Sequence, residues 1–357
     1  METVFVGIDF GTLNTSVASS NGLREVMQTV VGWPKDHIAR EMIGQDVVFG
    51  AEIHDHRLAL DVVRPFQRGA LKFQDPAAVG INEEEAIRNK KAATLILRQA
   101  VSLVQPSREA TTCGVVGVPS RCTAKNKQLV LEIAQQALDH VMLVPEPFAV
   151  GYGTKQCHNG LVIDIGAGTI DLCPMFGALP EDQDQLTIPY GGDFVDDDFC
   201  QRMLAAHPEA RLSLNIARQV KEKHGFVGSE EKSVKVKLPV KGRPPREFDV
   251  TEPLRQSCEM IVAEIVKGIH ELIWQLDPEV QHPIISNIVL SGGGSQLKGL
   301  DTVLEAALAE HGRIRVSRVH DTVFSGAMGA LRLAMGMPSE HWKRLRQSQP
   351  PAQTSMV

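Results

Sequence analysis

The chain has 357 residues, of which 43% are hydrophobic and 22% are charged, and its formal net charge is −6. This length exceeds what one hydrophobic core usually serves, so it predicts two domains. The negative charge argues against a general nucleic-acid binder, because such a protein needs a basic face.

The start of the chain, METVFVGIDFG, lacks the basic region and the long apolar run of a signal peptide. No apolar stretch approaches the ~20 residues that a membrane span needs. The six cysteines form no CxxC pair, and the twelve histidines form no HxxxH cluster. We therefore expect a cytoplasmic protein with reduced thiols and no structural metal site.

Residues 4–17, VFVGIDFGTLNTSV, predict a buried strand, a tight turn and a returning strand. Gly11 lets the backbone approach a phosphate, and Thr12 and Asn14 add side-chain donors. Asp9 ends the buried strand, where a carboxylate needs a cationic partner, and hydrated Mg²⁺ is a natural one. An ordinary hairpin with a capping aspartate also fits this segment when it is taken alone.

Residues 33–66 hold few clear elements and are interpreted as an insert. Farther along, Asn82 and Glu85 can cap a helix that runs to about Val104. A short strand is expected over Gly114–Val118, and a helix over Lys125–His140.

The segment Val144–Phe148 reads VPEPF, so two prolines fix the backbone around Glu146. A rigidly held glutamate can orient a water for in-line attack on a γ-phosphate. A surface glutamate in a turn explains the segment as well when it is considered alone.

Residues 161–173, LVIDIGAGTIDLC, repeat the pattern of residues 4–17. Asp164 corresponds to Asp9, Gly166 and Gly168 permit close approach to an anion, and Asp171 is interpreted as structural. Two such loops in one chain predict two domains of similar design, each offering one loop to a shared triphosphate.

Residues 191–250 are interpreted as a second insert, with an alternating strand near residues 232–240. A long helix is expected over Pro253–Leu276 and another over Leu300–Glu310. Between them, the strand Ile288–Leu290 leads into a glycine triplet at residues 292–294, which can lie flat against a ligand. The glycine spacing matches neither a Walker A loop nor a Rossmann fingerprint.

These segments, in this order, resemble the actin, chaperone and sugar-kinase ATPase superfamily. GIDFGTLNT, PEPFAVGYG, IDIGAGTID and IVLSGGGSQLKGL are similar to the bacterial actins of the MreB group, including the actins of magnetosomes. The resemblance covers nearly the whole chain. It implies an actin-like α/β fold with two duplicated domains, each carrying a smaller inserted subdomain, and a nucleotide in the cleft between them. The expected domains are residues 1–150 and 151–342, followed by a flexible tail at 343–357.

The resemblance also implies roles for individual residues. Two loops are expected to hold the β- and γ-phosphates, Asp9 and Asp164 to bind Mg²⁺ through water, and Glu146 and Asp164 to be catalytic. Lys221 and Glu222 are expected beside the ribose and base, and the glycine triplet beside the adenosine. The phosphate and adenosine residues are Gly11, Thr12, Leu13, Asn14, Gly166, Ala167, Gly168, Thr169, Gly292, Gly293 and Gly294.

The function implied by the resemblance is that of an ATPase that polymerises head to tail with ATP and disassembles after hydrolysis to ADP. Its filaments would organise magnetosome chains in the cytoplasm, alongside magnetosome membranes and through adaptor proteins. The N-terminus lacks the amphipathic helix that anchors some relatives, so no direct membrane insertion is expected. A sugar-type kinase and an ATP-binding scaffold that does not polymerise are the alternatives on the same fold.

Overall fold

The computed structural model describes residues 2–77, 79–105, 109–229 and 233–348. Contacts divide the chain into a first unit, which holds the described residues up to Gln156 and from Val323 onward, and a second unit, Cys157–Thr322. This division differs from the predicted boundaries at residues 150 and 342. The reason is that α10 (Ser325–Gly336) packs on β1 (Thr3–Phe10) and on α4 (Glu146–Gly153).

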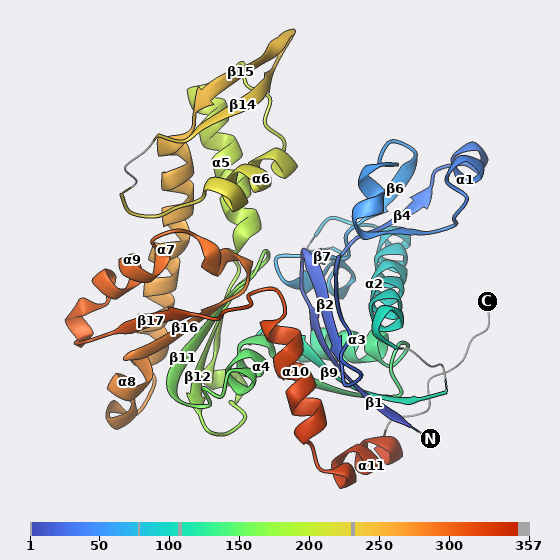
Figure 1. Ribbon diagram of the computed structural model, residues 1–357, viewed down its shortest axis with the longest axis vertical. Helices are drawn as coiled ribbons and strands as arrows, with labels where there is room; N and C mark the ends of the chain where they lie inside the picture. Colours follow the sequence, from blue (N-terminus) through green and yellow to red (C-terminus); the bar gives the residue numbers. More distant parts are fainter. Residues whose placement is uncertain (1, 78, 106–108, 230–232, 349–357) are drawn as a thin grey trace. The chain divides into compact units, whose positions relative to one another are not determined.

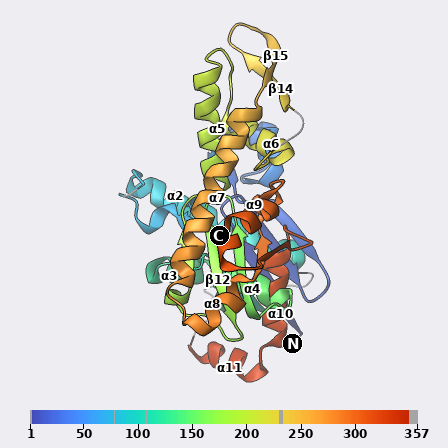
Figure 2. The same ribbon diagram turned by 90° about the vertical axis from the view of Figure 1, so that its left-hand side faces the viewer.

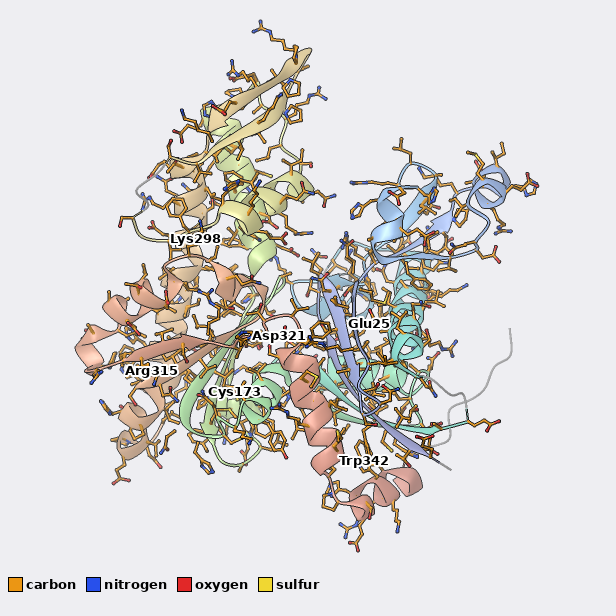
Figure 3. The ribbon with its side chains drawn as sticks, viewed as in Figure 1. Glu25, Cys173, Lys298, Arg315, Asp321 and Trp342 are labelled. Carbon is orange, nitrogen blue, oxygen red and sulfur yellow. The ribbon has the colours of Figure 1, made fainter. Side chains whose placement is uncertain are left out.

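The helix after α10 also belongs to the first unit. It is α11 (Ser339–Ser348), so the predicted flexible tail differs from the structure over residues 343–348. Trp342, labelled in Figure 3, is 4% exposed, and its indole Nε1 donates to the carbonyl oxygen of Ala334 over 3.2 Å. A buried tryptophan holds α11 against the unit, and residues 349–357 lie outside the described chain.

A five-stranded mixed sheet forms the centre of the first unit (Figure 1). The parallel strands β1, β9 and β10 are followed laterally by the antiparallel strands β2 and β3. In spatial order the strands are β10 (His140–Pro145), β9 (Thr111–Val118), β1, β2 (Asn14–Ser19) and β3 (Arg24–Gln28). The predicted first hairpin is confirmed as β1–β2.

Both faces of β1 are covered, which explains its nearly continuous apolar sequence. Val6 and Ile8 are fully buried in a core shared with α2 (Glu83–Val104). On the opposite face, a methyl group added to Gly7 would lie only 2.1 Å from the carbonyl oxygen of Ala327 in α10. Only glycine therefore allows the α10 backbone to approach the strand so closely.

The helix predicted after Asn82 is confirmed as α2, and it begins with a capping box. The Asn82 side chain accepts from the amide of Glu85, and the Glu85 carboxylate accepts from the amide of Asn82. The next helix, α3 (Ala124–Ala134), ends earlier than predicted. Residues after it form a turn that places buried Leu138 against Gly114 of β9, before β10 begins at His140.

The insert near residues 33–66 forms a small three-stranded sheet with one short helix. Asp36 caps this helix by accepting from the amide of Ala39 over 2.8 Å. The elements are β4 (Val31–Pro34), α1 (His37–Ile43), β5 (Val48–Phe49), η1 (Gly50–His54) and β6 (Leu60–Val63). The short elements β7 (Phe66–Gln67), β8 (Ala70–Leu71) and η2 (Lys72–Gln74) follow it.

The second unit repeats the sheet of the first, strand for strand. Its parallel strands β11, β16 and β17 and its antiparallel strands β12 and β13 correspond to β1, β9, β10, β2 and β3. The spatial order is β13 (Leu186–Ile188), β12 (Ile170–Phe176), β11 (His158–Ile165), β16 (Asn287–Ser291) and β17 (Arg315–Arg318). The predicted second hairpin is confirmed as β11–β12, and the predicted duplication is visible in the topology.

Helices cover the second sheet and extend into its insert, where α5 and α7 run side by side (Figure 2). The buried face of α7 includes Leu254, Ile261 and Ile265, as its period predicts. The helices are α5 (Gly192–Ala206), α6 (Leu214–His224), α7 (Thr251–Ile273), α8 (Pro278–Ile285) and α9 (Leu300–Ala307). The insert also holds the hairpin β14 (Lys235–Val240) and β15 (Arg243–Asp249), and η3 spans Asp182–Asp184.

Candidate functional site

The turn between β1 and β2 is held by a threonine that follows β3. The Thr29 hydroxyl donates to the carbonyl oxygen of Gly11 and the Thr29 amide to that of Leu13, each over 2.8 Å. A methyl group on Gly11 would lie 2.8 Å from the carbonyl oxygen of Asn14, so the turn needs glycine at this position. Asn14 is exposed at the end of the turn, where its side chain can donate to a ligand.

Asp9 lies at the end of β1, against the start of α10. A methyl group on Gly326, the second residue of that helix, would lie 2.6 Å from a carboxylate oxygen of Asp9. The positive end of a helix dipole stabilises a carboxylate at this place. Gly326 therefore leaves room for the Asp9 carboxylate at the start of α10, a role that the sequence analysis missed.

Glu146 begins α4 and is 9% exposed. A methyl group on Gly117 would lie 2.9 Å from Cγ of Glu146, so the glycine leaves room for this side chain. Gly117 in turn pairs with Asp9 across β9 and β1. The structure thus brings the predicted residues Asp9 and Glu146 to the same end of the first sheet.

The turn between β11 and β12 is held by the start of α5. The Gly192 amide donates to the carbonyl oxygen of Gly166 over 2.9 Å, and the Asp193 amide to that of Ala167 over 2.8 Å. Gly191 lies so close that a methyl group there would be 2.6 Å from both of these oxygens. The Gly-Gly pair before a helix was the signal that could have identified this contact in the sequence.

Asp164 accepts a short hydrogen bond of 2.5 Å from the hydroxyl of Ser291. Ser291 pairs with it across β16 and β11, as Gly117 pairs with Asp9. Burial raises the pKa of Asp164, and the Ser291 hydroxyl partly opposes that shift. Burial makes the ionised form of this carboxylate unfavourable, and a nearby cation would stabilise that form.

Asp171 has a structural role, as the sequence indicated. It is fully buried, and its carboxylate accepts from the hydroxyls of Thr169, over 2.8 Å, and Thr187, over 2.5 Å. These bonds join β12 to β13 and to the second turn. Thr169, which was predicted to bind phosphate, thus directs its hydroxyl to Asp171.

The glycine triplet after β16 has two different sides. Methyl groups on Gly292 and Gly294 would lie 2.5 Å and 2.3 Å from atoms of Ile165, whereas one on Gly293 would meet nothing within 4 Å. Gly292 also has a positive φ of 75°. The first and third glycines therefore pack the loop onto β11, and the middle one, which begins η4 (Gly293–Gln296), faces open space.

Lys221 is directed toward the second turn from α6. Its Nζ donates to the carbonyl oxygen of Gly192 over 2.6 Å and lies 2.7 Å from the carboxylate of Asp196. Arg218 contacts the same carboxylate over 3.1 Å. Burial raises the pKa of Asp196, and these two cations partly oppose that shift. The ion pairs hold α6 against α5. Glu222 lies exposed at the next position of α6.

The segment that follows α6 is joined by backbone hydrogen bonds to the segment that follows the triplet. The Val227 amide donates to the carbonyl oxygen of Lys298 over 2.9 Å, and the Lys298 amide to that of Gly225 over 3.3 Å (Lys298 is labelled in Figure 3). In the second unit the structure therefore gathers Asp164, the second turn, Lys221 and the triplet. A strand-end carboxylate beside a glycine turn is a donor set that fits a hydrated divalent cation and phosphate.

Comparison with known proteins shows the family of the chain. The MreB/Mbl protein family matches residues 77–338. The actin-like protein MamK of Paramagnetospirillum magneticum is 37% identical over 342 residues, which are 96% of this chain and 95% of the relative. No helix in the described parts of this chain combines the length and the hydropathy that crossing a bilayer requires.

Solved structures agree with this assignment. The MamK double helical filament matches with a TM-score of 0.88 and 36% identity, over 94% of this chain and 100% of that one. A non-polymerising MamK mutant bound to AMPPNP matches with a TM-score of 0.70 and 36% identity, over 94% and 99% of the two chains. The predicted actin-like fold is confirmed, and the chain belongs to the MreB/Mbl family of actin-like proteins.

Proposed function

We propose that this chain is an ATPase that polymerises into filaments with ATP and disassembles after hydrolysis. The observation that carries the proposal is its match to a MamK filament subunit over 94% of the chain with a TM-score of 0.88. Binding of AMPPNP by a MamK mutant supports ATP as the ligand. The family match over residues 77–338 includes Glu146, the second hairpin and the triplet, which are segments that the proposal uses.

The two turns hold the phosphates of one ATP in this proposal. Gly11 to Asn14 supply backbone and side-chain donors from the first unit, and Gly166 to Gly168 from the second. Thr29 and the first residues of α5 hydrogen-bond to the carbonyl oxygens of these turns. These bonds hold the turns in one conformation, so their backbone amides are preorganised for an anion. Thr169 contributes its backbone rather than its hydroxyl, because that hydroxyl binds Asp171.

Asp9 and Asp164 would hold a hydrated Mg²⁺ ion, which would neutralise the charge of the phosphates. Lys221, Glu222 and the open face at Gly293 hold the nucleoside. Glu146 accepts a proton from the attacking water and holds it in line with the γ-phosphate. Its position at the first turn of α4, between two prolines, limits its freedom and suits this orienting role.

Filament formation follows from a head-to-tail contact, which does not close and therefore propagates. Loss of the γ-phosphate removes a group that both turns hold, and this weakens the assembled state. Organisation of magnetosome chains through adaptor proteins is the cellular role that the resemblance implies.

Sedimentation tests the proposal. The purified chain with Mg²⁺ is centrifuged with ATP, with ADP and without nucleotide, and phosphate release is followed in parallel. We expect pelleting with ATP, with less pelleting as phosphate accumulates. Absence of pelleting under all three conditions contradicts filament formation, and phosphorylated product from a panel of sugars would favour the kinase alternative.

A matched pair of aspartate variants separates nucleotide binding from folding. Asp164→Ala should lose the dependence of pelleting on ATP, because the carboxylate that faces the cation is gone. Asp277→Ala changes an exposed aspartate of the same unit whose side chain makes no capping bond, so it should bind nucleotide like the wild-type chain.

A further inference from the structure

Two histidines and a glutamate meet in the second unit, apart from the residues proposed to bind nucleotide. His270 lies in the last turn of α7, and Glu310 and His311 lie in η5 (Ala309–His311). The potential ligand atoms of the three side chains all lie within 4.8 Å of one another. The sequence analysis missed this group because His270 is far in the sequence from the adjacent pair Glu310 and His311, and only the packing of η5 near α7 joins them.

The distances within the group suit a bound ion better than direct hydrogen bonds. Nε2 of His270 lies 3.5 Å and Nε2 of His311 3.6 Å from the same carboxylate oxygen of Glu310. A hydrogen bond of this type is about 2.7–3.2 Å long. Ligands that each lie about 2.0–2.2 Å from a tetrahedral zinc ion are about 3.4 Å apart, which is close to both observed values.

The two imidazole nitrogens are also unsatisfied. Among the described residues, neither His270 Nε2 nor His311 Nε2 has a hydrogen-bond partner, although both atoms are buried. Such atoms are uncommon in folded proteins, and an ion or a water usually explains them. The rings are already placed side by side, with their centroids 5.0 Å apart.

The surroundings supply positioning and access. The His270 ring stacks on Trp274 at 5.4 Å with an interplanar angle of 15°, which fixes its orientation. The C-terminal end of α7 favours a cation through the helix dipole. His270 also lines a groove of ≈ 1000 Å³ along α7, and the Glu310 side chain is 70% exposed, so an ion can reach the group from solvent.

We propose that His270, Glu310 and His311 form a binding site for one Zn²⁺-like ion. Two imidazoles and one carboxylate are a donor set that zinc accepts, with water in the fourth position. The ion would join the end of α7 to η5, and hard Mg²⁺ would bind this set poorly because it prefers oxygen ligands.

Metal titration of the full chain tests the site. The protein is treated with a chelator, returned to buffer with excess Mg²⁺ and no nucleotide, and titrated with Zn²⁺ in a calorimeter. We expect the wild-type chain to bind one more Zn²⁺ than His311→Gln, or to bind it at least about 10-fold more tightly. Glu310→Gln should weaken the same binding step, and its side chain is 70% exposed, so this variant should fold normally.

The matched control is His37→Gln. His37 lies 3.2 Å from Glu41 on α1. Among the described residues, this histidine–glutamate pair belongs to no group of three potential metal ligands, so it should not bind Zn²⁺ in the same way. The substitution should leave the Zn²⁺ titration unchanged. Equal titrations of the wild-type chain, His311→Gln and Glu310→Gln would overturn the proposal, and so would the loss of the same binding step in His37→Gln.

A spectroscopic measurement locates the ion independently of these variants. Co²⁺ can replace Zn²⁺ in such sites, and it quenches the fluorescence of a nearby indole. Co²⁺ should quench the wild-type chain in proportion to site occupancy, with reversal by Zn²⁺, and Trp274→Phe should remove this quenching. Undiminished quenching in Trp274→Phe would place the ion elsewhere and contradict the site.

Discussion

Glu146 is the residue whose environment most directly suggests chemistry. It is 9% exposed, stands between Pro145 and Pro147, and occupies space that Gly117 leaves open. Glu146→Gln keeps the size of this side chain but removes the proton acceptor. We expect phosphate release with ATP to fall by about 100-fold or more, while ATP-dependent pelleting persists.

The control for this variant is Glu132→Gln, which changes a partly exposed glutamate on α3 that contacts Lys90 over 3.3 Å. It should release phosphate at the wild-type rate. An unchanged rate in Glu146→Gln would remove Glu146 from the proposed role.

The positions of candidate site residues in the fold were predictable where nearby glycines or prolines constrain the backbone. The Ile-Asp-x-Gly pattern identified both hairpins, and two prolines identified Glu146. Ser291 and Gly326 were missed, because each acts on an aspartate that is distant in the chain. The sequence also could not show that Gly293 faces open space while Gly292 and Gly294 pack against Ile165.

Helix α10 shows how a single element depends on glycines for its position. A methyl group on Gly329 would lie 1.9 Å from the carbonyl oxygen of Ala149 in α4. Backbone atoms cannot yield as the end of a side chain can, so Gly329→Ala should lower the free energy of unfolding by about 2–3 kcal/mol. Urea denaturation followed by circular dichroism measures this change.

Gly336→Ala in the same helix is the control. Its added methyl group would meet only the hydroxyl end of the Tyr152 side chain, at 2.9 Å, which can move. The free energy of unfolding should change by less than about 1 kcal/mol, because alanine is the better helix former. Similar effects of the two substitutions would show that α10 does not pack as described.

Elements were predictable when their signals are local. The Asn82 capping box and the apolar period of α7 identified their helices. The predicted end of α3 was wrong, because residues after Ala134 leave the helix and place Leu138 against Gly114 of a neighbouring strand, and this contact is not visible in the sequence. The sequence analysis also failed to assign α10 to the first unit. The glycines of α10 indicate close packing, but they do not reveal which surface the helix packs against.

At the scale of the whole molecule, the two units differ in how the chain builds them. The second is continuous, Cys157–Thr322, and contains its own sheet and core. The first needs the segment after Val323, because α10 covers β1. We expect residues 157–322 to unfold cooperatively in urea as an isolated fragment, and residues 1–156 to lack a cooperative transition.

Adding residues 323–348 to the 1–156 fragment through a Gly/Ser linker should restore that transition. A short linker suffices, because the two ends to be joined lie close together. Near these ends, a methyl group on Gly153 would lie 3.8 Å from the carbonyl oxygen of Ser325. Cooperative unfolding of residues 1–156 alone, with the same midpoint as the linked chain, would contradict this assignment.

Gly117 and Ser291 occupy equivalent positions in the two sheets, yet they give their neighbouring aspartates different surroundings. Both residues stand opposite a strand-end aspartate, but one position provides a hydroxyl and the other provides a vacancy. The hydroxyl of Ser291 holds the Asp164 carboxylate in place, whereas the space at Gly117 admits the side chain of Glu146 beside Asp9. The two repeated sheets therefore give their equivalent aspartates different surroundings, and the absence of a side chain at Gly117 matters as much as the hydroxyl at Ser291.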